Sequence, residues 1–186
     1  MMICAGASEQ AVSQWASTFA EKGLGISKMV GDLSGPMAFA TMMGISRVFY
    51  GKYGDRINLD RFMIFSSLLC ITSYLGISLI PIPQISLVAY AICGLSVGIM
   101  WPGTFSKAAG SLSRGGTAMF ALLALGGDLG CSGGPTLVGF VSSYAGNLKM
   151  GILAGVIFPV LLLIGILACK KNKTKARYKD LSQQKR

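Results

Sequence analysis

The segment "SRVFYGKYGDRINLDRF", residues 46–62, separates two apolar stretches and combines helix-breaking residues with a high density of charge. Gly51, Gly54 and Asp55 can end a helix, and the side-chain oxygen of Asn58 can cap the start of the next one. Four of the seventeen residues are basic and two are acidic. We therefore predict a tight, charged turn between two helices.

The chain on either side of this turn is too apolar for a water-soluble domain. Hydrophobic residues make up 52% of the 186 residues and charged residues 13%, and the mean hydropathy is +0.60. Glycine contributes 25 residues, roughly double the ~7% of average usage. Small residues at this frequency are typical of closely packed helices in lipid. The composition therefore predicts an integral membrane protein.

Uncharged apolar runs of about twenty residues predict membrane-spanning helices. Six stretches meet this pattern, although two of them are interrupted by a single acid and a third is shorter, with Asp32 near one end. They are residues 1–20, 29–46, 62–81, 84–106, 117–147 and 150–169. We predict an all-α bundle of six transmembrane helices over residues 1–169, followed by a basic, disordered tail over residues 170–186.

The distribution of lysine and arginine predicts how the bundle is oriented. Eight basic residues and one acidic residue lie between Lys170 and Arg186. When this tail is placed in the cytoplasm, fourteen basic residues fall on the cytoplasmic side and three on the other. We therefore expect a multi-pass protein of the plasma membrane with both termini cytoplasmic. A basic segment directly after a hydrophobic helix favours contact with anionic lipid over nucleic-acid binding.

The sequence lacks several residue patterns on which catalysis and metal binding depend. Histidine is absent, and the five cysteines stand singly in apolar stretches without a C-x-x-C spacing. No Ser–His or Cys–His pair can therefore form. We predict neither an enzyme, nor a metal site, nor a cofactor.

The first predicted helix carries an unusual row of polar side chains. Glu9, Gln10 and Gln14 fall in one arc of the helical wheel together with Ser13 and Ser17. Hydrocarbon cannot satisfy such groups, so the row should face the bundle interior or a water-filled cavity. One interpretation is a solute-facing wall. The other is hydrogen bonding between helices without contact to a solute. Glu9 favours the first, because a lone carboxylate is costly at that depth.

Asp128 is the second acid within a predicted span, and it lies between Gly127 and Gly130. An acid at such a depth is a candidate proton-coupling group. A buried acid held by hydrogen bonds for structure is the alternative.

The same predicted span contains a row of small residues. Gly126, Gly130 and Gly134 recur every four residues and would place a smooth face against another helix. Pro135 follows directly and lacks an amide donor, so we expect the helix to bend there.

The turn of residues 46–62 resembles the signature loop of the major facilitator superfamily, in which a glycine, three residues and Asp-Arg precede further basic residues. Gly51, Asp55, Arg56 and Arg61 occupy those positions, whereas Asn58 stands where the family has a second glycine. The loop also joins the second and third of six predicted helices, as it does in each half of these transporters. Residues 126–135 resemble the family's eleventh helix, and residues 98–108 resemble the tenth helix of fucose-permease-like members.

The resemblance implies the C-terminal half, helices seven to twelve, of a twelve-helix transporter, built from two inverted three-helix repeats. Such proteins work by alternating access, in which two bundles rock about a central site. The resemblance places the first and fourth helices on the cavity and the signature loop at the cytoplasmic gate. The residues so assigned to the cavity are Glu9, Gln10, Gln14, Trp101 and Thr104, and those of the gate are Asp55 and Arg56.

The leading hypothesis is a secondary transporter half that moves a small polar solute, such as a sugar, with coupling to protons. Its partners would be the solute, protons, the bilayer and a missing N-terminal half, or else a second copy of the chain. The first predicted helix starts at residue 1, and we expect the part that precedes it in a whole transporter to be missing. The alternatives are a non-transporting membrane scaffold or subunit and an inactive fragment of a split transporter gene.

Overall fold

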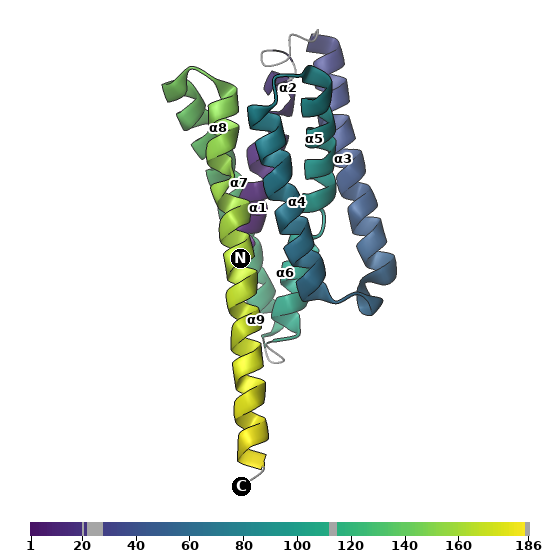
Figure 1. Cartoon of the computed structure of the whole chain (residues 1–186), viewed down its shortest axis with the longest axis vertical. Helices are drawn as coiled ribbons and strands as arrows, with labels where there is room; N and C mark the ends of the chain where they lie inside the picture. Colours follow the sequence, from purple (N-terminus) through teal and green to yellow (C-terminus); the bar gives the residue numbers. More distant parts are fainter. Residues whose placement is uncertain (20, 22–27, 112–114, 185–186) are drawn as a thin grey trace.

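The computed structural model describes residues 1–19, 21, 28–111 and 115–184, and within these ranges every regular element is a helix. Figure 1 shows these helices packed side by side, with the C-terminal helix projecting beyond the others. Their bounds are α1 Met2–Ser13, α2 Ala16–Thr18, α3 Lys28–Tyr53, η2 Gly54–Arg56, α4 Leu59–Leu79, α5 Pro83–Val97, α6 Met100–Ala109, α7 Gly116–Ala145, α8 Leu148–Gly155 and α9 Ile157–Gln184.

Three helical segments in the described part of the chain are long and apolar enough to cross a membrane. They are Leu59–Leu79, Gln84–Ala109 and Leu148–Lys171. The second segment includes α5 and α6, and the third includes α8 and the first part of α9, so each pair of consecutive helices forms one candidate span. Large apolar side chains are exposed on these spans, as expected for surfaces that contact lipid. The six-helix count remains a prediction, because the other three predicted spans do not meet this measure.

Helix α1 lies at the centre of the packing. It contacts α5, α6, α7, α8 and α9, and in Figure 1 it lies behind α4 and α9. Two buried tyrosines bind its backbone: the Tyr74 hydroxyl donates to the Ser8 carbonyl at 2.7 Å, and the Tyr90 hydroxyl donates to the Val12 carbonyl at 3.0 Å. Because these hydroxyls come from α4 and α5, both helices are tied to α1.

Glycine allows α1 and α7 to approach until their backbones touch. A Cβ atom on Gly134 would lie 2.7 Å from the Ala7 carbonyl oxygen, and one on Gly130 would overlap the Ile3 carbonyl oxygen. Gly126, in contrast, has room for a Cβ atom in ordinary van der Waals contact. Of the three glycines predicted to form a smooth face, Gly130 and Gly134 therefore face the α1 backbone.

Helix α7 continues without interruption from Gly116 to Ala145, so Pro135 lies inside it. Pro135 is itself buried. At the other end of the chain, α9 runs on to Gln184 and therefore continues into the tail that the sequence predicts to be disordered.

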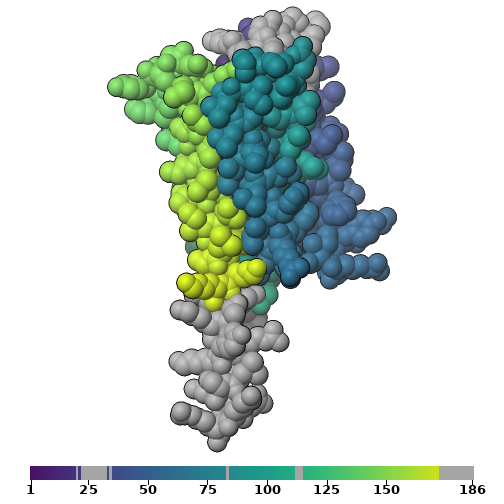
Figure 2. Space-filling model, viewed as in Figure 1, coloured from purple at the N-terminus to yellow at the C-terminus, as the bar shows by residue number. Residues whose placement is uncertain are grey.

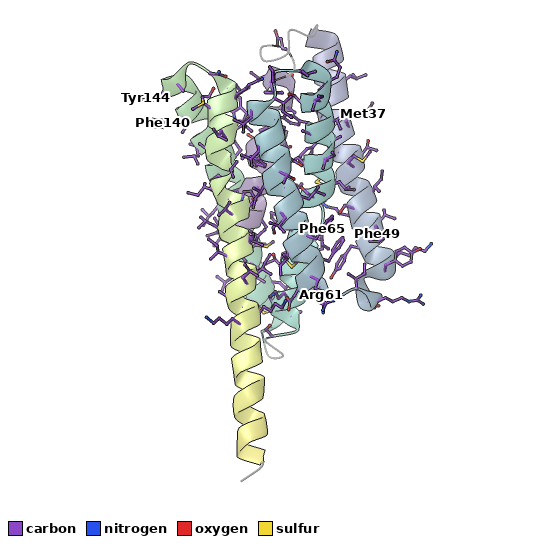
Figure 3. All side chains as sticks on the ribbon, viewed as in Figure 1. Met37, Phe49, Arg61, Phe65, Phe140 and Tyr144 are labelled. Atoms are coloured by element: carbon purple, nitrogen blue, oxygen red, sulfur yellow. The ribbon has the colours of Figure 1, made fainter. Side chains whose placement is uncertain are left out.

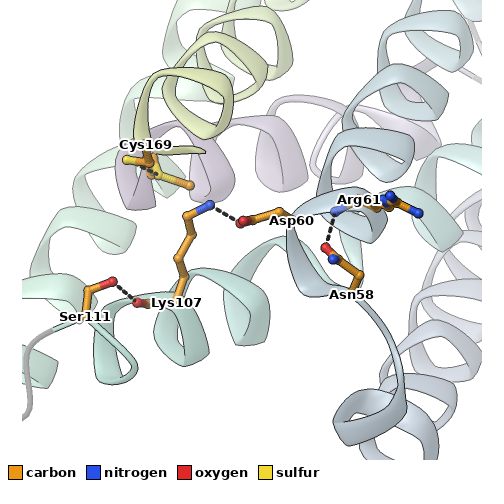
Figure 4. Close-up of polar contacts among 7 residues, drawn as sticks. Asn58, Asp60, Arg61, Lys107, Ser111 and Cys169 are labelled. Carbon is orange, nitrogen blue, oxygen red and sulfur yellow. Dashed lines mark hydrogen bonds and ion pairs between the residues drawn. The ribbon is translucent and has the colours of Figure 1, made fainter. Parts of the chain in front are cut away.

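The turn between α3 and α4 contains the predicted cap. The Asn58 side-chain oxygen accepts a hydrogen bond from the Arg61 amide at 3.1 Å, as Figure 4 shows. This confirms Asn58 as the residue that begins α4. Gly51, however, does not end the preceding helix, since α3 continues to Tyr53 and is followed by the 3₁₀ turn η2. The helix break therefore falls at Gly54.

Candidate functional site

Helices α1 and α7 pack against each other, and both carry polar side chains. We call these residues the α1–α7 polar face; they are Glu9, Gln10 and Ser13 of α1, Gln14 at its C-cap, and Asp128, Ser132 and Thr136 of α7. None of these seven side chains is fully buried. The carboxylates of Glu9 and Asp128 both act electrostatically on the Cys131 thiol, so the two acids belong to one neighbourhood.

Glu9 has a partner that the sequence analysis did not assign to it. Arg47 of α3 reaches its carboxylate, with 3.3 Å between Nη2 and Oε2. The Arg47 side chain is 45% exposed and that of Glu9 13% exposed. Sequence reasoning placed Arg47 in a cytoplasmic flank, whereas the structure uses it to neutralise an acid on α1.

Asp128 begins a row of exposed polar side chains along α7. Ser132 and Thr136 follow at intervals of four residues, which places the three on one side of the helix. The Ser132 hydroxyl donates to the Asp128 carbonyl at 3.1 Å, and the Thr136 hydroxyl donates to the Ser132 carbonyl at 2.7 Å. Both hydroxyl protons are therefore used within α7, while the oxygen lone pairs remain open to a donor.

A cavity of about 680 Å³ lies where α7 passes into α8, next to the break between α1 and α2. Its volume is within the range typical of small-molecule sites. The lining is Trp15, Thr18, Gly139, Ser142, Ser143, Gly146, Asn147, Leu148 and Lys149. The lining comes from two stretches that are far apart in the chain, residues 15–18 and 139–149, so no local pattern in the sequence indicates the cavity.

Two side chains of the cavity lining are fixed by hydrogen bonds to other helices. The Trp15 indole N–H donates to the Pro135 carbonyl at 3.2 Å, and the Lys149 ammonium donates to the Ile80 carbonyl at 2.9 Å. One wall of the cavity is therefore aromatic and held in place. The hydroxyls of Ser143 and Thr18 and the Asn147 amide provide polar groups on the others.

Trp101 and Thr104 lie on α6, away from this cavity lining. The Trp101 ring packs over Gly127 and lies 6.2 Å from the Phe105 ring, measured between centroids. Its indole nitrogen is buried without a hydrogen-bond partner. The Thr104 hydroxyl is buried and donates to the Met100 carbonyl at 2.7 Å. The structure thus places Trp101 against α7, whereas Thr104 is satisfied within its own helix.

The charged turn after α3 is connected to the bundle by a residue that the sequence analysis passed over. Asp60 forms an ion pair with Lys107 of α6, and Figure 4 shows this contact between the start of α4 and the end of α6. Lys107 is only 8% exposed. Asp55, Arg56 and Arg61, which were assigned to a gate, are exposed. Nothing in the spacing of the sequence distinguishes Asp60 from Asp55 as the paired acid.

The described residues contain no group of three or more His, Cys, Asp or Glu side chains arranged to hold a metal ion. The chemistry of the polar face is therefore that of carboxylates, amides, hydroxyls and one guanidinium.

Together, the helical bundle, its apolar exposed surfaces and the α1–α7 polar face define an integral membrane protein with polar groups along one pair of helices. Residues 1–135 match the Major Facilitator Superfamily, and the chain belongs to this family. The family consists of membrane transporters that move small solutes across a bilayer. The comparisons with curated proteins and with solved structures gave no match.

Proposed function

We propose that this chain is the C-terminal half of a secondary active transporter that moves a small polar solute, such as a sugar, by alternating access with coupling to protons. The observation that carries the proposal is the α1–α7 polar face. It consists of two acids, two amides and three hydroxyl residues on two segments that pack against each other, in a chain that belongs to a transporter family. Polar groups at membrane depth need water, protein or a solute beside them, because hydrocarbon offers no hydrogen bonds.

The geometry of α7 suits a path for a hydroxylated solute. The row of Asp128, Ser132 and Thr136 continues at helical spacing to Gly139 and Ser143, which line the 680 Å³ cavity. The open lone pairs of this row can accept hydrogen bonds from solute hydroxyls. The Trp15 ring offers an apolar face on which a sugar ring can rest. A solute could therefore remain hydrogen-bonded along the length of α7.

The ion pair of Glu9 and Arg47 provides a group whose protonation would change the charge of the polar face. When Glu9 is charged, it holds Arg47 and ties α3 to α1. When Glu9 accepts a proton, the guanidinium loses its partner, and α3 is released from this contact. A proton can in this way favour one arrangement of the helices over another, which is the requirement for coupling.

We further propose that a second bundle covers the polar face, either an N-terminal six-helix half or a second copy of this chain. Both termini would lie in the cytoplasm of a plasma-membrane protein, with the basic tail against anionic lipid. Asp55, Arg56 and Arg61 would belong to the cytoplasmic gate.

The test is uptake of radiolabelled monosaccharides by the complete assembly in proteoliposomes, driven by an inward proton gradient. We expect Glu9→Gln and Asp128→Asn each to abolish accumulation against a gradient while leaving exchange across the membrane measurable. Glu21→Gln removes an exposed acid away from the polar face and should leave accumulation unchanged. Normal accumulation in both of the first two variants would disprove proton coupling through these acids.

A non-transporting scaffold remains the second candidate, because Ser132 and Thr136 already satisfy their own hydroxyl protons within α7. In that case Gln10→Leu and Gln14→Leu would abolish assembly of the complex. No monosaccharide would then change the fluorescence of Trp15. Retained assembly together with lost uptake would instead support the transporter.

A further inference from the structure

An apolar groove lies between α3 and α4 on the outer surface of the bundle. Both helices pack against α5, which forms the floor between them. The groove has a volume of about 260 Å³ and almost no polar surface. Figure 3 shows Phe49 on α3 and Phe65 on α4 at either side of it. The lining residues are Ile45, Ser46, Phe49, Phe62, Phe65, Ser66, Leu69, Leu95 and Ser96.

The end of the groove nearest the charged turn is closed by aromatic rings. The Phe49 and Phe62 rings meet across it with 6.1 Å between centroids, and Tyr53 continues the cluster beside Phe49 at 5.1 Å. At the floor, the Ser96 hydroxyl is already used by its bond to the Cys93 carbonyl at 2.6 Å. The hydroxyls of Ser46 and Ser66 also line the groove, but almost all of its surface is apolar, so it suits hydrocarbon better than a polar solute.

Basic side chains surround this closed end. Lys52, Arg56 and Arg61 are all exposed, and Lys52 lies over the Tyr53 ring at 5.6 Å from its centroid. Arg61 directly precedes the groove residue Phe62, and Figure 3 shows it on α4 below Phe65. The two ion pairs found in the described part of the chain use other basic residues, and one of them neutralises Asp60. The same turn carries one further exposed acid, Asp55, so three basic side chains against one acid leave the rim of the groove net positive.

We propose that this groove binds one anionic phospholipid, with an acyl chain between Phe49 and Phe65 and the phosphate at Arg61 and Lys52. The charge of the rim matches an anionic headgroup, because basic residues at a membrane surface attract such lipids. The apolar interior matches an acyl chain, and its small volume accommodates a chain segment and excludes a packed protein helix. This inference requires only that the protein is embedded in a membrane and does not depend on the solute or on proton coupling.

The experiment uses the full-length protein, purified in mild detergent, depleted of lipid and then titrated with phosphatidylglycerol or phosphatidylcholine. Native mass spectrometry counts the lipids bound to each protein. We expect one tightly bound phosphatidylglycerol and no equivalent phosphatidylcholine. Arg61→Gln should weaken this binding about fivefold, because one basic contact at a membrane surface is lost. Phe65→Ser, which removes one wall of the groove, should weaken the binding of phosphatidylglycerol, because its acyl chain loses an apolar contact.

A matched control separates the groove from general lipid contact. Phe140→Ser removes an exposed phenylalanine on α7, on the opposite side of the bundle in Figure 3. It should not change the count of bound phosphatidylglycerol. Equal loss in the control and the groove variants would overturn the proposal, as would equal affinity for the two lipids.

A measurement on the unaltered protein guards against variants that fail to fold. Phosphatidylglycerol with a photoreactive acyl chain should label peptides that contain Phe49, Phe65 or Leu95 under ultraviolet light, in competition with the unlabelled lipid. Labelling spread evenly over the apolar surface would contradict a defined site. If cross-linking instead joined two protein chains through these residues, a second copy would be the occupant and the lipid proposal would be wrong.

Discussion

The close contact of α1 and α7 makes a sharp prediction at two neighbouring glycines. Gly133 and Gly130 lie one turn apart on α7, yet a Cβ atom at Gly133 would meet nothing within 4 Å, whereas one at Gly130 would overlap the Ile3 carbonyl oxygen. Alanine at Gly133 should therefore gain about 0.5–1 kcal/mol of stability from its better helix propensity. Alanine at Gly130 must push α1 away from α7, a form of overpacking that typically costs about 1–3 kcal/mol.

These energies translate into a measurable difference in thermal stability. In a chain of this length a cost of ~2 kcal/mol lowers the Tm by about 4–8 °C. The assay is thermal unfolding of the purified protein in detergent, followed with a dye that fluoresces on reacting with the buried thiols as they become exposed. We expect Gly130→Ala to unfold several degrees below the unaltered protein and Gly133→Ala at or slightly above it. The same Tm for both alanine variants would refute the backbone contact between α1 and α7.

Two further substitutions test the polar contacts that join distant helices. Asp60→Asn leaves the Lys107 ammonium buried without its counter-charge and should lower the free energy of unfolding by about 1–3 kcal/mol. Asp55 is exposed, so Asp55→Asn should change this free energy little. Thermal unfolding compares the two variants, and equal Tm values would contradict the pairing. Tyr74→Phe removes the buried hydroxyl that donates to the Ser8 carbonyl and should cost about 1 kcal/mol; an unchanged Tm would show that this bond contributes nothing net.

The position of α4 follows closely from the sequence because lipid imposes one simple requirement. Each span must satisfy its own backbone and present apolar side chains, so uncharged runs identify helices directly. Helix α4, from Leu59 to Leu79, begins directly after the predicted cap and ends two residues before residue 81, where the predicted span ends. Its packing partners could not be read in the same way, because an apolar side chain can face either lipid or another helix. Family membership, confirmed by the match over residues 1–135, supplies the expected order of helices.

The charged pairs were beyond sequence reasoning for a different reason. Glu9 and Arg47 are 38 residues apart, and Asp60 and Lys107 are 47 residues apart. No periodicity links partners at such separations, since helical spacing relates only residues three or four positions apart. The helical wheel predicts Glu9 in an arc of polar residues but could not show that a basic side chain of α3 reaches it. Which acidic and basic side chains form ion pairs depends on how α3 packs against α5 and α2, and this packing is a property of the whole bundle.

The interruption of the first helix shows how residues far along the chain determine local structure. The sequence contains neither glycine nor proline near Gln14 and Trp15, and it predicts one continuous helix over residues 1–20. In the structure α1 ends at Ser13, and the Trp15 amide bonds to the Val12 carbonyl, three residues back, at 3.1 Å. The Tyr90 hydroxyl donates to that same carbonyl from α5.

A tightened turn of this kind weakens the regular hydrogen bonding of the backbone, and in lipid such a loss has to be compensated by side chains. The Tyr90 hydroxyl compensates it on one side of the break, and the Trp15 indole anchors the other side to the Pro135 carbonyl of α7. Trp15 thereby becomes part of the cavity wall, while Gln14, the C-cap of α1, stays exposed. The interruption therefore gives two neighbouring residues different environments, which no pattern in the sequence could indicate.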